Sequence, residues 1–162
     1  MEEKKTLSVG NKAPDFELRD HLGKPFRLSD YKGKRVLLSF HPLAWTSVCA
    51  EQMKSLEANK ENFDAVNTVP VGVNVDSVPS KQAWANELGI QHTRLLSDFW
   101  PHGAVAQNYC IFREKDGFSE RANIIVDEDQ TIAFIKIYEI SQLPEIEELL
   151  RFLQGEEATT EW

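Results

Sequence analysis

The sequence has few cysteines, no long apolar run and no excess of positive charge. Its two cysteines, Cys49 and Cys110, are too few and too far apart for the disulfide framework of a small secreted protein. The charged residues 1–5 do not lead into the apolar segment of a signal peptide, and no stretch is apolar enough to span a membrane. The net charge of −8 argues against nucleic acid or a membrane surface as partner. We therefore expect a cytoplasmic protein with reduced thiols.

Signs of a second domain and of a metal site are also missing. No repeat, linker or low-complexity tract divides the chain, so we expect one domain over its 162 residues, with a loose acidic tail from about residue 155. The histidines His41, His92 and His102 do not show metal-ligand spacing with Cys49. We therefore expect no metal and no cofactor.

What the sequence does contain is a buried strand that leads to a cysteine at a helix start. Arg35–Phe40 is a short apolar run typical of a strand buried on both faces, and Pro42 ends it because proline has no N–H for the sheet. Apolar residues then recur at near-helical spacing from Val48 to about Phe63. Cys49 thus lies in the first helical turn, where unpaired N–H groups and the helix dipole favour thiolate over thiol.

Four positions form a recognisable motif. Pro42, Thr46 and Cys49 stand in a Pro-x-x-x-Thr-x-x-Cys pattern, and Arg121 begins a late strand. This set resembles the peroxiredoxins, in which the triplet and an active-site arginine occur in this order. The resemblance covers roughly residues 8 to 153.

Two segments resemble one branch of that family in more detail. They are Pro42-Leu43-Ala44-Trp45-Thr46 and Ser97-Asp98-Phe99-Trp100-Pro101-His102-Gly103. Both are most similar to the alkyl hydroperoxide reductase E branch, whose members work with one essential cysteine.

The resemblance implies a role for each motif residue. Cys49 is the nucleophile, and Arg121 holds its thiolate and binds the peroxide oxygens. Thr46 places a hydroxyl beside the sulfur, and Pro42 stiffens the loop that carries both. The N–H groups of Val48 and Cys49 steer and polarise the peroxide.

Three neighbouring side chains have less definite assignments. His41 is expected to shape the wall of the peroxide pocket. Trp45 and Trp100 line the entrance, form a subunit contact or belong to the core. Gln52, one turn into the cysteine helix, supports the arginine, supports the end of its own helix or lies on plain surface.

Each catalytic assignment has a structural alternative. A cysteine at a helix start is often a small buried residue and not a nucleophile, and this alternative applies to Cys49. Thr46 has the residue type of a helix cap, and an arginine at a strand start, here Arg121, is often solvated or ion-paired. Capping and catalysis by Thr46 are compatible.

Cys110 has two interpretations. We take it as a buried structural residue between Tyr109 and Ile111. The alternative makes it a resolving cysteine that forms a disulfide with Cys49, which requires Cα atoms within ~7 Å or local unfolding.

The patterns beyond the motif predict the fold class. Strands are expected at residues 15–18, 25–28, 69–75, 93–97, 121–127 and 131–137, and helices at about 79–88, 102–108 and 146–153. The helix at 79–88 is expected to turn Ala83, Trp84 and Leu88 inwards. Strand and helix alternate with right-handed parallel crossovers, and a hairpin ends the sheet. We therefore predict an α/β protein with a thioredoxin-like fold, a mixed central sheet flanked by helices.

The predicted function is that of a thiol-dependent peroxidase. Cys49 attacks hydrogen peroxide or an organic hydroperoxide and becomes a sulfenic acid, which an external thiol such as thioredoxin or a glutaredoxin-like protein reduces again. Relatives in this branch are commonly dimers, so the resemblance implies a homodimer. One alternative is a peroxide-sensing redox switch or binding module that uses Cys49 without fast turnover. A thioredoxin-type disulfide reductase would need a Cys-x-x-Cys motif, and this chain has Thr46 in place of its first cysteine.

Overall fold

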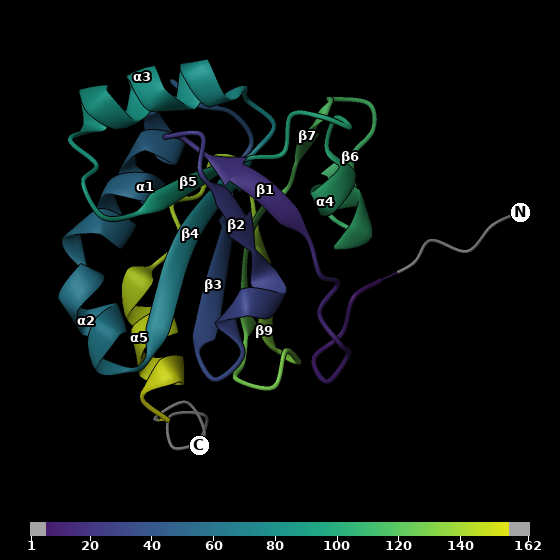
Figure 1. The fold of residues 1–162 in the computed structure, drawn as a ribbon, viewed down its shortest axis with the longest axis vertical. Coiled ribbons are helices and arrows are strands. Elements are labelled where there is room, and N and C mark those ends of the chain that lie inside the picture. Colours follow the sequence, from purple (N-terminus) through teal and green to yellow (C-terminus); the bar gives the residue numbers. More distant parts are fainter. Residues whose placement is uncertain (1–5, 156–162) are drawn as a thin grey trace, which may run out of the picture.

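The apolar runs of the sequence form the centre of a mixed sheet (Figure 1). The computed structural model describes residues 6–155, and within them seven strands are hydrogen-bonded in the order β2-β1-β5-β4-β3-β8-β9. Strands β3, β4 and β5 are parallel, and the outer neighbours are antiparallel. The strands of this sheet are β1 (Glu17–Asp20), β2 (Pro25–Arg27), β3 (Arg35–Phe40), β4 (Thr68–Asn74), β5 (Arg94–Ser97), β8 (Arg121–Val126) and β9 (Ile132–Tyr138).

Helices follow the strands as the alternating pattern requires. They are the 3-10 turn η1 (Leu28–Tyr31) and the helices α1 (Ser47–Ala58), α2 (Lys60–Ala65), α3 (Val78–Leu88), α4 (Ala104–Asn108) and α5 (Ile146–Leu153). A separate two-stranded ribbon joins β6 (Phe112–Arg113) to β7 (Phe118–Ser119). This is the mixed α/β architecture that the sequence predicts.

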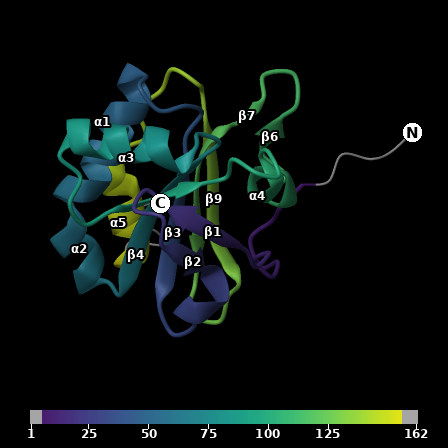
Figure 2. The same ribbon diagram turned by 45° about the horizontal axis from the view of Figure 1, so that its top comes forward.

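The two faces of the sheet carry separate hydrophobic clusters. Along β3, Val36, Leu38 and Phe40 belong to one cluster, whereas Leu37 belongs to the other, as the two-residue repeat of a strand requires. Figure 2 shows α1, α2, α3 and α5 on one side of the sheet and α4 on the other. Cys49 lies in the cluster beneath α1. Arg121, at the start of β8, must therefore point to this face to reach it.

The helix that carries Cys49 is shorter than predicted. It ends at Ala58, and α2 begins at Lys60, so the expected helix to Phe63 is in fact two. Between them the side-chain amide of Asn59 donates to the Ser55 carbonyl at 2.8 Å. Asparagine bonds its local backbone in this way at helix ends, which explains the break.

The inner face of α3 also differs from the prediction. Ala83 is exposed, while Lys81, Trp84 and Ala85 are buried and Leu88 is half-buried. The spacing of these four positions is that of one helical face. Lysine is seldom buried, so a pattern of apolar residues does not indicate Lys81 as part of this face.

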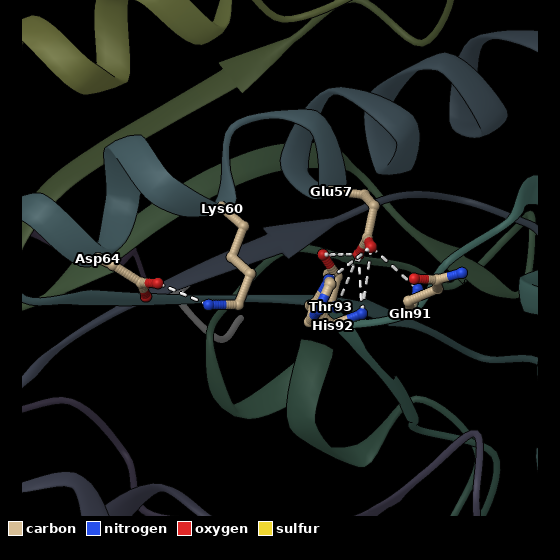
Figure 3. A network of polar contacts seen from close by, with 6 residues as sticks. All are labelled: Glu57, Lys60, Asp64, Gln91, His92 and Thr93. Carbon is tan, nitrogen blue, oxygen red and sulfur yellow. Dashed lines mark hydrogen bonds and ion pairs between the residues drawn. The ribbon is translucent and has the colours of Figure 1, made fainter.

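A carboxylate network fixes the far end of α1 (Figure 3). Both Glu57 oxygens accept backbone N–H bonds from the loop before β5, and Thr93 adds its hydroxyl at 2.9 Å. Burial raises the pKa of Glu57, but the N–H bonds from Gln91, Thr93 and His92 outweigh it and lower that pKa to about 2. Next to it, Lys60 and Asp64 form an ion pair at 2.6 Å. The network keeps α1, and with it Cys49, in register with the sheet.

The expected acidic tail lies almost wholly outside the described residues, which end at Gly155. Between residues 6 and 155, every helix is too short or too polar to cross a bilayer.

Candidate active site

The sulfur of Cys49 lies between the start of α1 and the start of β8. Thr46 is the N-cap residue of α1, which begins at Ser47, so Cys49 lies in the first turn as predicted. Arg121 is the first residue of β8, the strand paired with β3. Its Nη1 atom donates to Cys49 Sγ at 3.3 Å. Two residues 72 positions apart are thus brought into direct contact.

The guanidinium of Arg121 is fixed by further partners. Nη1 also donates to Gln52 Oε1 at 2.7 Å, and Nε donates to the Ile140 carbonyl at 2.9 Å. Gln52 in turn donates to the Ser39 hydroxyl at 2.7 Å and to the carbonyl that ends β3 at 3.2 Å. Of the three alternatives for Gln52, the structure therefore shows the first, support of the arginine. The cation is held against the sulfur by α1, β3 and the segment after β9 together.

The loop from Pro42 to Thr46 is tied to the end of the neighbouring strand. Pro42 is buried, and the Ala44 N–H donates to Asp76 Oδ2 at 2.7 Å. The Thr46 hydroxyl donates to the Leu43 carbonyl at 3.0 Å and makes no capping bond to α1. Because its proton is engaged, the Thr46 oxygen has lone pairs left to accept a hydrogen bond.

The sulfur is covered although its neighbours are open. Cys49 is 0% exposed, whereas Thr46 is exposed and Val48 is half-buried. Trp45 is 55% exposed and donates from Nε1 to the Ser80 hydroxyl at 3.2 Å.

His41, the residue after β3, is fully buried. Its ring packs against Trp84 with centroids 5.5 Å apart, and Nδ1 lies 3.3 Å from the Ser39 carbonyl. Nε2 has no hydrogen-bond partner within the described residues. Burial, together with the charges of Lys81 and Arg121, holds the pKa of His41 well below its ordinary value. The ring is therefore neutral at neutral pH.

Cys110 lies on a different part of the fold. It follows α4 with a positive φ of 62° and is partly buried. Its neighbours Tyr109 and Ile111 pack in the cluster on the opposite face of the sheet from Cys49. Both cysteines are free thiols in this structure.

The other histidines have local partners. His92 lies 3.1 Å from Glu57, and Nε2 of His102 lies 2.7 Å from the Gly117 carbonyl. Within residues 6–155, no three His, Cys, Asp or Glu side chains are grouped as a metal site would require.

Several residues of the site are not evident from the sequence. Asp76 holds the loop, the Ile140 carbonyl holds Arg121, and the buried Lys81 of α3 donates to Asn74 at the end of β4. Only Lys81 carries a usable sequence signal, because it lies three positions before Trp84 on the same helical face.

Comparison with known proteins places the chain among peroxide-reducing enzymes. Residues 9–135 match the AhpC/TSA family. Alkyl hydroperoxide reductase E from Mycobacterium tuberculosis (strain ATCC 25618 / H37Rv) is 39% identical over 132 residues, 81% of this chain and 86% of that protein. Peroxiredoxin-1 from Gekko japonicus is 34% identical over 157 residues, 91% of this chain and 78% of that protein.

A solved structure has the same overall fold. The mitochondrial 2-cys peroxiredoxin from Plasmodium falciparum superposes with a TM-score of 0.83 at 25% identity, over 91% of this chain and 93% of that one. The predicted thioredoxin-like fold is thereby confirmed.

Proposed function

The chain belongs to the AhpC/TSA family and is a thiol-dependent peroxidase, and we propose that Cys49 is its peroxide-reducing thiol. The observation that carries this assignment is the 3.3 Å bond from Arg121 Nη1 to Cys49 Sγ. A guanidinium is always charged and donates strongly to an anion, so the contact favours the thiolate, which is the nucleophilic form.

In the proposed reaction, sulfur displaces one peroxide oxygen from the other. The Cys49 thiolate forms a bond to the nearer oxygen, the O–O bond breaks, and the farther oxygen leaves with the electron pair. It takes up a proton and departs as water or an alcohol, while Cys49 becomes a sulfenic acid. Arg121 donates to the oxygens as charge moves onto them, and Thr46 accepts from the peroxide O–H. The N–H groups of Val48 and Cys49 complete the polar surroundings.

Access to the sulfur requires a small displacement. Because Cys49 is fully buried, we propose that the peroxide enters beside Val48 as the loop around Trp45 moves outward. Pro42 limits how far this loop moves, and His41 supplies a neutral wall behind it. Hydrogen peroxide and small organic hydroperoxides are the substrates that fit so narrow an entry.

We propose that the enzyme works with one cysteine. Cys110 lies beside residues of the opposite core cluster, so it is not positioned to condense with Cys49. The sulfenic acid is then reduced by two equivalents of an external thiol, from thioredoxin or a glutaredoxin-like protein, which release water and become a disulfide. The alternative of a redox sensor or binding module is not favoured, because the relatives are named as enzymes.

The assembly and location are also part of the proposal. We propose a homodimer in the cytoplasm. Phe99 and Trp100 are 50% and 79% exposed and border a groove with Val78 and Pro79, and exposed aromatic side chains of this kind are typical of interfaces. Light scattering on a sizing column is expected to show a dimer that Trp100→Glu dissociates and Leu143→Glu, at a separate exposed site, does not. A monomeric wild-type protein would contradict the dimer.

Mass spectrometry of peroxide-treated protein tests the assignment of Cys49. With dimedone present, the sulfenic acid adduct is expected on Cys49 in both the wild-type protein and the Cys110→Ser variant. Cys49→Ser is expected to lose both the adduct and peroxide consumption. An adduct confined to Cys110, or a Cys49–Cys110 disulfide, would overturn the one-cysteine mechanism.

A further inference from the structure

A buried lysine lies beside the site without a carboxylate partner. Lys81 is 0% exposed, and its ammonium donates to Asn74 Oδ1. No ion pair within 4 Å joins it to any described residue (6–155). An ammonium group removed from water is unfavourable unless other charges compensate it. The surroundings of Lys81 must therefore provide that compensation.

A chain of hydrogen bonds connects this ammonium to the cysteine loop. Asn74 accepts from Lys81 through Oδ1 and donates from Nδ2 to Asp76 Oδ2 at 2.8 Å. The same Asp76 oxygen accepts the Ala44 N–H at 2.7 Å. Charge at one end of such a chain polarises and strengthens the bonds along it. Through Asn74 and Asp76, Lys81 thus influences the backbone N–H of Ala44, two positions before Thr46.

Lys81 also lies within the electrostatic reach of the sulfur. The strand residues Gly72 and Asn74 share the sheet face of Cys49, and α3 and α1 lie side by side over it (Figures 1 and 2). Arg121 comes to the sulfur from β8, on one side of β3. Lys81 stands over β4, on the other side. Strand β3 thus lies between the strand that carries Arg121 and the strand whose Asn74 binds Lys81, and the charge of Cys49 acts on Lys81.

From this arrangement we propose that Lys81 is a positioning residue of the peroxidase site, which holds the loop through Asn74 and Asp76 and adds a second positive charge that favours the Cys49 thiolate. The inference rests on the proposed role of Cys49. In this view, the negative charges that compensate the buried Lys81 ammonium are those of the Cys49 thiolate and Asp76.

Lys81 gains or loses its proton near neutral pH. Burial lowers the pKa of Lys81 to about 7, and the charges of Asp76, Cys49 and Asp98 oppose that fall. The titratable and charged groups that face it from the surrounding elements are His21, His41, Cys49, Asp76 and Asp98. Coupling between two charges is reciprocal, so a thiolate that gains from the ammonium must in turn keep the ammonium protonated.

The first test is the rate of the reaction with hydrogen peroxide in Lys81→Met, measured by stopped flow from pH 5 to 9. We expect a loss of about tenfold at pH 7 and a shift of the rate profile towards higher pH by about one unit. The matched control is Lys54→Met, an exposed lysine on α1, which is expected to stay within about twofold of the wild type because exposed charges are screened.

Stability separates this role from a purely structural one. The unfolded chain binds a proton at Lys81 more tightly than the folded chain does, so the charge destabilises the fold at pH 7. Lys81→Met is therefore expected to unfold in urea at the same or a higher concentration than the wild type while it reacts more slowly. A variant that reacts more slowly and also unfolds at a lower urea concentration than the wild type would contradict the proposal.

Reciprocity gives a second readout that does not depend on Lys81→Met folding. In lysine-labelled protein followed by NMR, Lys81 is expected to titrate at lower pH in Cys49→Ser than in the reduced wild type. Identical titration would overturn the inference, as would a wild-type rate and pH profile in Lys81→Met. Failure of the wild type to outpace free cysteine would instead contradict the proposed role of Cys49.

Discussion

At the scale of single residues, Cys49 differs from an ordinary buried cysteine by the cation fixed against it. Arg121 donates to the sulfur, and Gln52 and the Ile140 carbonyl hold Arg121 in place. The side chain of Gln52 is neutral, so the guanidinium keeps its full charge for the thiolate and the peroxide of the proposed reaction. A carboxylate at position 52 would compete for that charge.

Gln52→Glu tests this requirement. The new carboxylate pairs with Arg121, so we expect the rate of Cys49 with hydrogen peroxide at pH 7 to fall by about ten- to a hundredfold. Stopped-flow measurement checks it, with Gln82→Glu as a control that makes the same chemical change on the exposed side of α3. Equal rates in all three proteins would show that the charge on Arg121 does not govern the reaction.

His41 makes stability depend on pH. Its pKa is lower in the folded protein than in the unfolded chain, so the unfolded chain binds more protons below about pH 6.5. The resulting stability is present above that pH and is lost as the pH falls below it. His41→Phe removes the titrating group and keeps a ring against Trp84.

We therefore expect a difference in acid sensitivity between the two proteins. Between pH 7.5 and 5.5 the wild type should lose about 1 kcal/mol more unfolding free energy than His41→Phe. Urea denaturation at the two pH values measures this, with His102→Phe, an exposed histidine, as the control. The same loss in wild type and His41→Phe would mean that His41 is protonated in the folded state.

The sequence indicates the proposed site residues more readily than the groups that hold them in place. The spacing of Pro42, Thr46 and Cys49 is local, so the motif is readable without the fold. The bonds from the Ala44 N–H to Asp76 and from Arg121 to the Ile140 carbonyl join distant segments and depend on strand register and loop path. No composition or spacing rule marks such acceptors in advance.

At the scale of elements, the position of α1 depends on its two ends. Its first turn is held by the Arg121 and Gln52 contacts, and its last by Glu57, whose oxygens accept N–H groups before β5. The helix break at Asn59 and the inward Lys81 on α3 were missed for one reason. Periodicity counts apolar residues, whereas both features involve polar side chains with specific hydrogen-bond partners, Ser55 for Asn59 and Asn74 for Lys81.

Glu57→Gln tests the anchor at the far end of α1. The pKa of Glu57 in the folded protein is about 2, below its unfolded value, so its contribution is complete above about pH 4.5 and is lost as the pH falls towards 2. We expect the variant to lose about 1–3 kcal/mol of unfolding free energy at pH 7.

The comparison needs two pH values and a matched variant. Urea denaturation should show a smaller difference between the wild type and Glu57→Gln at pH 3 than at pH 7. Below about pH 4.5 the unfolded wild-type chain takes up a proton at Glu57, whereas the glutamine of the variant does not titrate. Glu61→Gln changes an exposed residue on α2 and is expected to leave stability within about 0.5 kcal/mol. A constant difference at both pH values would contradict the assigned role of the carboxylate charge.

At the scale of the whole molecule, the sheet separates the hydrophobic cluster that contains Cys49 from the cluster on its opposite face. The order of strands and helices in the sequence was sufficient for the mixed α/β class, because crossover handedness and a final hairpin leave few arrangements. Which residues share a face follows from strand alternation, and it places Ser39, Arg121 and Cys49 together. Tyr109 and Ile111, the neighbours of Cys110 after α4, pack in the other cluster.

The central claim is that a fixed cation makes one buried sulfur a fast peroxide nucleophile. Its most direct test is the second-order rate constant for hydrogen peroxide at pH 7, measured by stopped flow on the wild type, Arg121→Met and Cys49→Ser. The wild type is expected to exceed free cysteine by at least about a thousandfold, Arg121→Met to lose about a hundredfold or more, and Cys49→Ser to show no reaction. A wild-type constant equal to that of free cysteine, or an unchanged one in Arg121→Met, would contradict the claim.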